Sequence, residues 1–297
     1  MDSTVTESNI HHPTDSSLLW DSVRVLARLL VRNKDRAGVK VTNYTRRAKR
    51  CNFAIGYATT EAKRKSYFRD LLKVTRRTVR MAERMAEAVQ EFDAYLADEL
   101  RHYMGLARRV MDQTERRIYS RETVPASEKV VSIFEDHTDV IVKGRRDLSF
   151  GHKLFLTSGR SGLFLDCVVG KGNPPDTSLA LEMVERQESV YGRLPRQVAY
   201  DGGFASGTNL KAIKARGVQD VVFSKKRGMK VTEMAKSTWV YKQLWKFRAG
   251  IEGMISFLKR CFGMGRCTWR GESSFRSYAW GSVLSANFLL LARRLMI

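Results

Sequence analysis

Asp201 is placed where an acidic side chain can act on a bound ligand. It ends the apolar run RQVAYD (196–201), which is typical of a buried strand, and it is followed by Gly202 and Gly203. In open α/β sheets, reactive groups lie beyond the carboxyl ends of the strands, and glycine lets a backbone or a substrate approach closely. The alternative at this point is an ordinary turn formed by an Asp-Gly pair.

Glu252 is the second candidate, and its surroundings are strongly cationic. The pattern predicts a helix over about 239–262, on which Trp245, Arg248, Glu252 and Lys259 lie near one face because they are three, four and seven residues apart. From residue 225 onward the chain has 15 Lys and Arg but only three acids. This setting indicates either a metal ligand beside a phosphate-binding surface or an ordinary ion pair with Arg248 four residues earlier.

Asp2 is the third candidate. It begins a Ser- and Thr-rich segment, 2–10, that predicts a short strand, and the alternative is a solvated terminal residue. Hard divalent ions prefer oxygen ligands, and phosphodiester chemistry can use two such ions ~3.5–4 Å apart. Asp2, Asp201 and Glu252 can supply such a site only where the fold brings these distant residues together.

The hydrophobic pattern after residue 125 predicts an α/β fold, a mixed sheet flanked by helices. Short runs rich in Val, Ile and Phe predict strands at 129–134, 139–144, 152–158, 163–169, 196–201 and 220–224. Helices are expected at about 177–190, 206–216, 239–262 and 274–294. Strands followed by alternating strands and helices are typical of a mixed sheet with helices on its faces.

The first part of the chain is predicted to be mainly helical. A helix should follow residues 11–17, with Asp15, Ser16 or Ser17 as its N-cap. From about 66 to 118, apolar residues recur in a heptad-like seam interrupted at Thr75 and Asp93. Two interpretations stay open, a helical bundle packed against itself and a coiled coil between two copies of the chain.

Composition limits the partners and the compartment. The 297 residues carry a formal net charge of +22, and 43% of them are hydrophobic, enough for a sizeable core. Because the basic residues are spread through the chain, nucleic acid is favoured over a membrane surface, with a solvated basic surface as the alternative. No secretory signal peptide or membrane span is expected. The four cysteines form no CxxC pair, so no zinc site is expected and reduced thiols in the cytoplasm are the default.

Four segments resemble the DDE transposases of bacterial insertion sequences, particularly the ISNCY-type group. They are DSTVTESNIHHPTDSSLLWDSVRVL at the start, FGHKLFL (150–156) with the Asn-Pro-Pro-Asp stretch (173–176), AYDGGF (199–204), and WKFRAGIEGMISFLKRCFGMGRCTWRG (245–271). Related transposases carry a Tyr-x2-Arg-x3-Glu-x6-Lys signature on the glutamate helix. Here it reads Trp245, Arg248, Glu252 and Lys259, so the tyrosine hydroxyl is absent.

The resemblance implies an RNase H-like fold and DNA transposition. It implies Asp2, Asp201 and Glu252 as the catalytic acids and the ligands of two Mg²⁺ or Mn²⁺ ions. The expected chemistry is cleavage of DNA strands at the element ends, followed by attack of the freed 3′-hydroxyl on target DNA. Arg248 and Lys259 would contact DNA phosphates. The full expected DNA-binding set is Trp245, Arg248, Lys259, Arg260, Arg266 and Arg270.

The resemblance also implies a division of the chain. Residues 1–15 would give the first strand of the RNase H-like catalytic core, 16–125 a helical insertion after that strand, and 126–297 the rest of the core. Members of the family usually carry a helical DNA-binding region before the first aspartate, whereas Met1 directly precedes Asp2 here. We therefore expect a shortened copy.

Three functional hypotheses follow. The first is a transposase that binds double-stranded DNA, both element ends and target, as a dimer on DNA, with no membrane partner. We expect it in the bacterial cytoplasm, associated with the nucleoid when bound to DNA. The second is a DNA-binding remnant without catalysis, and the third is an RNase H-like nuclease without strand transfer.

Overall fold

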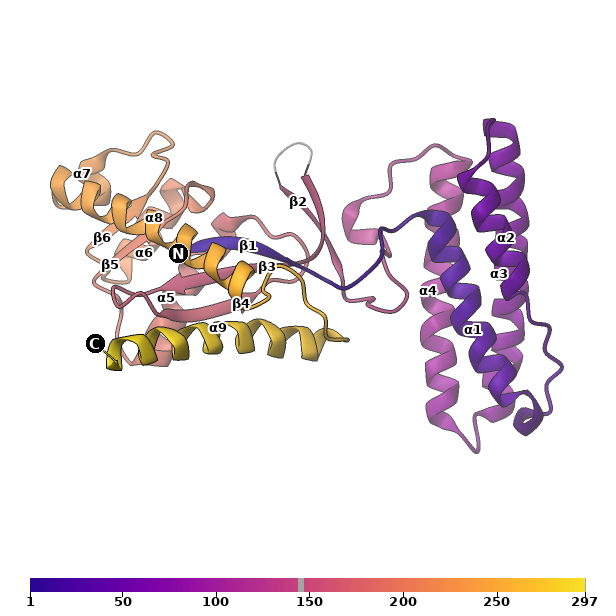
Figure 1. Ribbon diagram of the computed structural model, residues 1–297. Helices are drawn as coiled ribbons and strands as arrows, with labels where there is room; N and C mark the ends of the chain where they lie inside the picture. Colours follow the sequence, from indigo (N-terminus) through magenta and orange to yellow (C-terminus); the bar gives the residue numbers. More distant parts are fainter. Residues whose placement is uncertain (144–146, 297) are drawn as a thin grey trace. The chain divides into compact units, whose positions relative to one another are not determined.

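The computed structural model describes residues 1–143 and 147–296, and the chain divides into two compact units. The sheet unit consists of Met1–Asn9 and Asp139–Ile297, and the helical unit consists of Ile10–Thr138 (Figure 1). In the described part of the chain, no helix is long and apolar enough to cross a membrane.

Four helices form the helical unit. They are α1 (Asp15–Ala37), α2 (Thr45–Gly56), α3 (Glu61–Val89) and α4 (Ala94–Ile118), and a 3-10 turn, η1 (Ala126–Glu128), follows them. Buried apolar residues from all four helices join in a single cluster, as expected for a bundle packed against itself. Thr14, one residue before the predicted caps, caps α1 through its side chain, which accepts a hydrogen bond from the Ser17 N–H at 3.1 Å. Asp93, one of the two predicted interruptions, caps α4.

The prediction of a strand at 129–134 was wrong. Val130 and Ile133 are buried against the core of the helical unit, and no strand is formed there. The side chain of Gln113 on α4 satisfies the main chain of Val130, accepting from its N–H at 2.9 Å and donating to its C=O at 3.2 Å. A side-chain amide therefore takes the place of a neighbouring strand, which no hydrophobic pattern reveals.

The sheet unit is a mixed α/β structure, as predicted. Its strands are β1 (Asp2–Glu7), β2 (Asp139–Lys143), β3 (Asp147–Ser158), β4 (Phe164–Val169), β5 (Gln197–Tyr200) and β6 (Asp220–Phe223). The long strand β3 pairs antiparallel with β1, β2 and β4, whereas β5 and β6 are parallel.

Met1 joins the two sets of strands. Its N-terminal nitrogen donates to the Ala199 carbonyl at 2.6 Å, and the Asp201 N–H donates to the Met1 carbonyl at 3.2 Å. This is the hydrogen-bond pattern of neighbouring parallel strands. The strands therefore run in the order β4-β3-β1-β5-β6, with β2 beside the first residues of β3.

Helices cover both faces of this sheet. They are α5 (Asp176–Tyr191), α6 (Gly207–Ala215), α7 (Val231–Met234), α8 (Thr238–Cys261) and α9 (Glu272–Leu295), with a 3-10 turn, η2 (Gly202–Phe204), after β5. Because side chains alternate along a strand, Phe155 of β3 packs with α5, α6, β5 and β6, whereas Leu154 and Leu156 pack with α8 and α9 on the other face. Burial on both faces explains why β3 has three consecutive apolar residues, Leu154 to Leu156, in place of a strict alternation.

Candidate active site

The fold brings the three predicted acids to one place in the sheet unit. Asp2 is the first residue of β1, Asp201 directly follows β5, and Glu252 lies on α8. The hydrogen bonds at Met1 hold the start of β1 beside the end of β5, although Met1 and Ala199 are 198 positions apart in the sequence. Sequence spacing alone predicts no such meeting, because it depends on the pairing of strands.

Arg248 lies at the centre of these acids. Its Nη2 atom is 3.0 Å from Asp2 Oδ2 and 2.7 Å from Asp201 Oδ1, and its Nη1 atom is 2.7 Å from Glu252 Oε1. The Arg248 side chain is only 13% exposed. This guanidinium, which we expect to contact DNA phosphates, lies among three carboxylates in the structure without DNA.

The two aspartates differ in their protonation behaviour. Burial raises the pKa of Asp2, although the Ser3 N–H and the Arg248 charge oppose the shift. Burial acts in the same direction on Asp201, but the Gly202 N–H, the Arg248 charge and the Ser224 hydroxyl outweigh it, so that the pKa of Asp201 lies below its usual range. Asp201 is therefore the stronger acid of the two, and the Arg248 charge lowers the pKa of both carboxyl groups.

Residues that sequence reasoning did not single out position Asp201. The Ser224 hydroxyl, just after β6, donates to Asp201 Oδ1 at 3.1 Å. Trp245, half exposed on α8, donates from its indole Nε1 to the Ser224 carbonyl at 3.4 Å. This contact ties α8 to the end of β6. Trp245 was predicted to face DNA, and its ring retains an exposed surface beside the acids.

The two glycines after Asp201 permit close approach of charged side chains. A Cβ atom on Gly202 would lie 2.5 Å from Lys225 Cγ, and one on Gly203 would lie 2.2 Å from Asp176 Oδ2. Asp176, the acid of the Asn-Pro-Pro-Asp stretch, also pairs with Lys153 at 2.7 Å. A fourth carboxylate thus lies beside the loop that carries Asp201.

The remaining predicted DNA-binding residues follow Glu252 along α8 and the loop after it. Lys259 is half-buried on α8, and Arg260, Arg266 and Arg270 are exposed. The loop is fixed to the far end of β1, because the Glu7 N–H donates to the Gly265 carbonyl at 3.0 Å and the Cys267 N–H donates to the Glu7 carbonyl at 2.8 Å. These four residues continue the basic surface of α8 beyond Glu252 into the loop that follows the helix.

The donor set suits hard divalent cations, but the present arrangement is that of an acid cluster around an arginine. Three carboxylates converge on one guanidinium, and carboxylate oxygens are the ligands that Mg²⁺ and Mn²⁺ prefer. Over residues 1–143 and 147–296, however, no three His, Cys, Asp or Glu side chains are arranged to hold a metal ion. Metal binding by these residues therefore requires the Arg248 guanidinium to leave the space between them.

Three carboxylates that meet at the junction of two strands and a helix, in a basic mixed α/β unit, are the kind of oxygen donors that enzymes with two metal ions use on phosphodiesters. Residues 136–288, a little over half of the chain, match the family described as "Transposase DDE domain". The chain belongs to this family, and the resemblance to DDE transposases is confirmed. The matched segment includes Asp201, Arg248 and Glu252. Comparison with curated proteins and with solved structures gave no match.

Proposed function

We propose that this protein is a DNA transposase whose sheet unit cleaves DNA strands at the ends of an insertion sequence and joins them to target DNA. The observation that carries the proposal is the convergence of Asp2, Asp201 and Glu252 on one guanidinium. Membership of the transposase DDE family supports the reaction class.

The strand order supports an RNase H-like core. Three antiparallel strands, β4, β3 and β1, are followed by β5 and β6, which run parallel to β1, and helices cover both faces. On this proposal the helical unit, Ile10–Thr138, is an insertion between β1 and the rest of the core. Its bounds are wider than the expected insertion at 16–125, because residues 126–138 belong to the helical unit and not to the sheet unit. Asp201 then lies beyond the carboxyl end of β5, where ligands of such sheets bind, and the Arg248 contacts bring Asp2 and Glu252 beside it.

Asp2, Asp201 and Glu252 would hold the two Mg²⁺ or Mn²⁺ ions that the family implies. When bound, such ions activate the attacking oxygen and stabilise the leaving oxygen of a phosphodiester. The protein's own residues prepare the site: Ser224 and the Gly202 and Gly203 amides orient Asp201 and keep it ionised. Arg248 neutralises the acids until a cation replaces it, and its freed guanidinium is then available to a DNA phosphate.

The DNA partner is supported by two basic surfaces. The first is the α8 end with Lys259, Arg260, Arg266 and Arg270. The second, which we call the α2 cationic face, consists of Arg46, Lys49, Arg50 and Phe53, which line one shallow hollow in the helical unit and are all exposed. Their spacing of three, four and seven places them on one side of α2, a helix without any acidic residue.

A nicking assay tests the proposed reaction. The full chain is incubated with a supercoiled plasmid that carries the gene and its flanking DNA, with Mg²⁺ or Mn²⁺. We expect nicked plasmid, and a loss of at least about 100-fold in rate for Glu252→Gln, because several kcal/mol of charge stabilisation is lost. Glu233→Gln on α7 is the matched control, since it changes another of the few acids in the same basic segment.

The products separate the alternatives. Joined DNA molecules support strand transfer, whereas nicks without joining support a nuclease. DNA binding without nicking supports a non-catalytic remnant. If Glu252→Gln nicks as fast as the parent chain, the assignment of the three acids is wrong.

A further inference from the structure

The loop that follows β6 lies at the same edge of the sheet as Asp201. β5 and β6 are parallel neighbours, Asp201 directly follows β5, and Ser224 directly follows β6 (Figure 1). The carboxyl ends of parallel strands share one edge, which is where open α/β sheets bind their ligands. Residues 224–230, which we call the β6 loop, read Ser-Lys-Lys-Arg-Gly-Met-Lys, with four cations and no acid.

Lys225 of this loop is held against the residue that follows Asp201. A Cβ atom on Gly202 would lie 2.5 Å from Lys225 Cγ, 2.7 Å from Cδ and 2.9 Å from Cβ, so the lysine stem packs directly on the Gly202 backbone. Lys225 is nevertheless exposed. A lysine can pack its apolar stem on the protein and keep its ammonium group in water, and Lys225 therefore presents its charge beside Asp201.

The main chain just before Lys225 is tied to three elements of the site. The Ser224 N–H donates to the Tyr200 carbonyl at 3.0 Å, and the Ser224 hydroxyl donates to Asp201 Oδ1 at 3.1 Å. The indole of Trp245 donates to the Ser224 carbonyl at 3.4 Å. The start of the β6 loop is thereby held to β5, to the carboxylate and to α8.

The rest of the β6 loop forms a tight turn. The Met229 N–H donates to the Lys226 carbonyl at 3.0 Å, and the two residues between them, Arg227 and Gly228, have φ angles of 44° and 86°. Positive φ at both central positions is typical of a type I′ turn. The Lys226 ammonium lies 5.6 Å from the centre of the Tyr241 ring on α8. The second lysine of the loop is thus directed to α8.

Lys225 is not neutralised by the acids near it. Asp201 and Glu252 each pair with Arg248 at 2.7 Å. In the part of the chain that the structure describes, no carboxylate pairs with Lys225. Its ammonium group keeps three N–H donors for an anion, and hydrogen bonds between a cation and a phosphate oxygen are among the stronger ones.

We propose that Lys225 binds a DNA phosphate next to the phosphodiester that reaches Asp201. This inference rests on the proposed function and adds a DNA contact outside α8 and the loop after it. The ammonium group donates to a non-bridging phosphate oxygen, and no covalent bond forms or breaks. Its charge offsets the repulsion between the DNA backbone and the carboxylates, and its place on Gly202 holds the strand over Asp201.

Acetylation of lysines in the unmodified full chain tests the contact without any variant. The chain reacts with an acetylating reagent with and without a 30-base-pair duplex from the DNA that flanks the gene, and mass spectrometry reads each lysine. With duplex at about ten times its Kd, only about a tenth of the protein is free, so acetylation of Lys225 should slow about tenfold. Lys236 is the control, because it is exposed and its N–H donates to Asp220, at the opposite end of β6. Its acetylation rate should stay unchanged.

Variants at the same positions measure the charge. Lys225→Gln should lower the slope of log affinity for the duplex against log salt by about 0.9, the contribution of one phosphate contact. Lys225→Arg keeps the charge and should keep the slope, and Lys236→Gln should leave it unchanged. In the nicking assay, Lys225→Gln should raise the half-saturating plasmid concentration by about tenfold, as expected for the loss of one hydrogen bond to a charged group.

The outcomes separate this inference from the proposed function. If the parent chain nicks and Lys225→Gln changes neither the slope nor the half-saturating concentration, Lys225 does not bind the strand, and the proposed reaction stands. If duplex protects Lys225 but no nicking occurs, the DNA contact stands and the proposed reaction fails. Equal acetylation of Lys225 with and without bound duplex overturns the inference, even if Lys225→Gln fails to fold.

Discussion

Replacing Arg248 with Gln tests what holds the three acids together. Arg248 is 13% exposed, Asp2 9% and Asp201 34%, so the variant leaves two largely buried carboxylates without their cation. Truncating one partner of a buried ion pair costs about 3–5 kcal/mol, because the remaining charge is buried and unpaired. Glu252 is 62% exposed, so its contact adds at most about 1 kcal/mol. Because Asp201 is partly solvated, we expect a loss of about 3 kcal/mol at pH 7.

The same variant should respond more strongly to metal. The wild-type guanidinium occupies the space between the carboxylates and must be displaced before a cation binds, whereas Gln carries no charge there. A ligand that binds only the folded state stabilises it by about 2.7 kcal/mol at a concentration 100 times its Kd. Urea unfolding followed by circular dichroism, with and without Mn²⁺ and without DNA, measures both effects.

Arg186→Gln is the matched control. Arg186 donates two hydrogen bonds to buried Asp166, at 2.7 and 2.9 Å, with no further acid at the same guanidinium in the described part of the chain. We expect this variant to lose stability without any gain from Mn²⁺. If Arg248→Gln unfolds at the wild-type urea concentration, or if Mn²⁺ stabilises both proteins equally, Arg248 does not neutralise the acids.

The pH dependence of stability provides an independent check on the role of Arg248. Because burial raises the pKa of Asp2, the folded chain takes up this proton at a higher pH than the unfolded chain does. A group of this kind favours the folded state as pH falls and costs stability as pH rises through its folded pKa. Loss of Arg248 raises the pKa of Asp2 further. The stability deficit of Arg248→Gln should therefore shrink between pH 7 and pH 5.

Three further outcomes are expected. Changing the three cations of the α2 cationic face to Gln should lower the slope of log affinity for duplex DNA against log salt by about 3, since each phosphate contact contributes about 0.9. The same change at Arg76, Arg101 and Arg108, which pair with Glu115, Asp98 and Glu83, should lower it by less. Asn287→Ala should cost about 2 kcal/mol in urea unfolding, because the Asn287 side chain both donates to and accepts from the Phe164 main chain, at 2.8 and 2.9 Å. Iodoacetamide at pH 8 should modify exposed Cys261 alone in the native chain, by mass spectrometry, because Cys51 and Cys267 are buried and burial raises the pKa of Cys167 to about 12.

Local patterns determined most of the elements of the sheet unit. The predicted helix at 239–262 is α8, Thr238–Cys261, and the predicted strand at 196–201 contains β5. Apolar spacing and capping residues act within one or two turns, so a single sequence contains them in full. The short helix α7 and the helix α2 were not predicted as separate elements.

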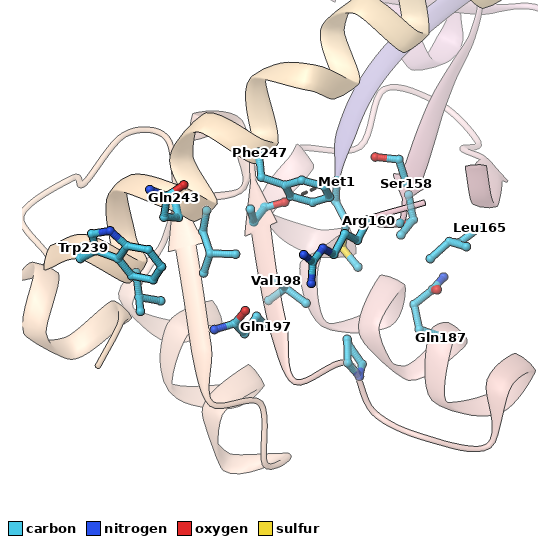
Figure 2. Close-up of a pocket in the computed structure, with 16 residues that line it drawn as sticks. Met1, Ser158, Arg160, Leu165, Gln187, Gln197, Val198, Trp239, Gln243 and Phe247 are labelled. Carbon is cyan, nitrogen blue, oxygen red and sulfur yellow. Dashed lines mark hydrogen bonds between the residues drawn. The ribbon is translucent and has the colours of Figure 1, made fainter. Parts of the chain in front are cut away.

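The sequence by itself also determined the family and the candidate acids, because the spacing of motif residues and the distribution of charge are properties of the linear chain. Only the tertiary structure decided that Arg248 lies among Asp2, Asp201 and Glu252 and not at the surface. It also decided that Gln113 satisfies Val130 and that Met1, Ala199 and Phe247 line one pocket of the sheet unit (Figure 2). These features depend on strand register and on contacts between residues far apart in the chain, such as Met1 with Ala199. Their energies arise only when the sheet is assembled, so no local pattern encodes them.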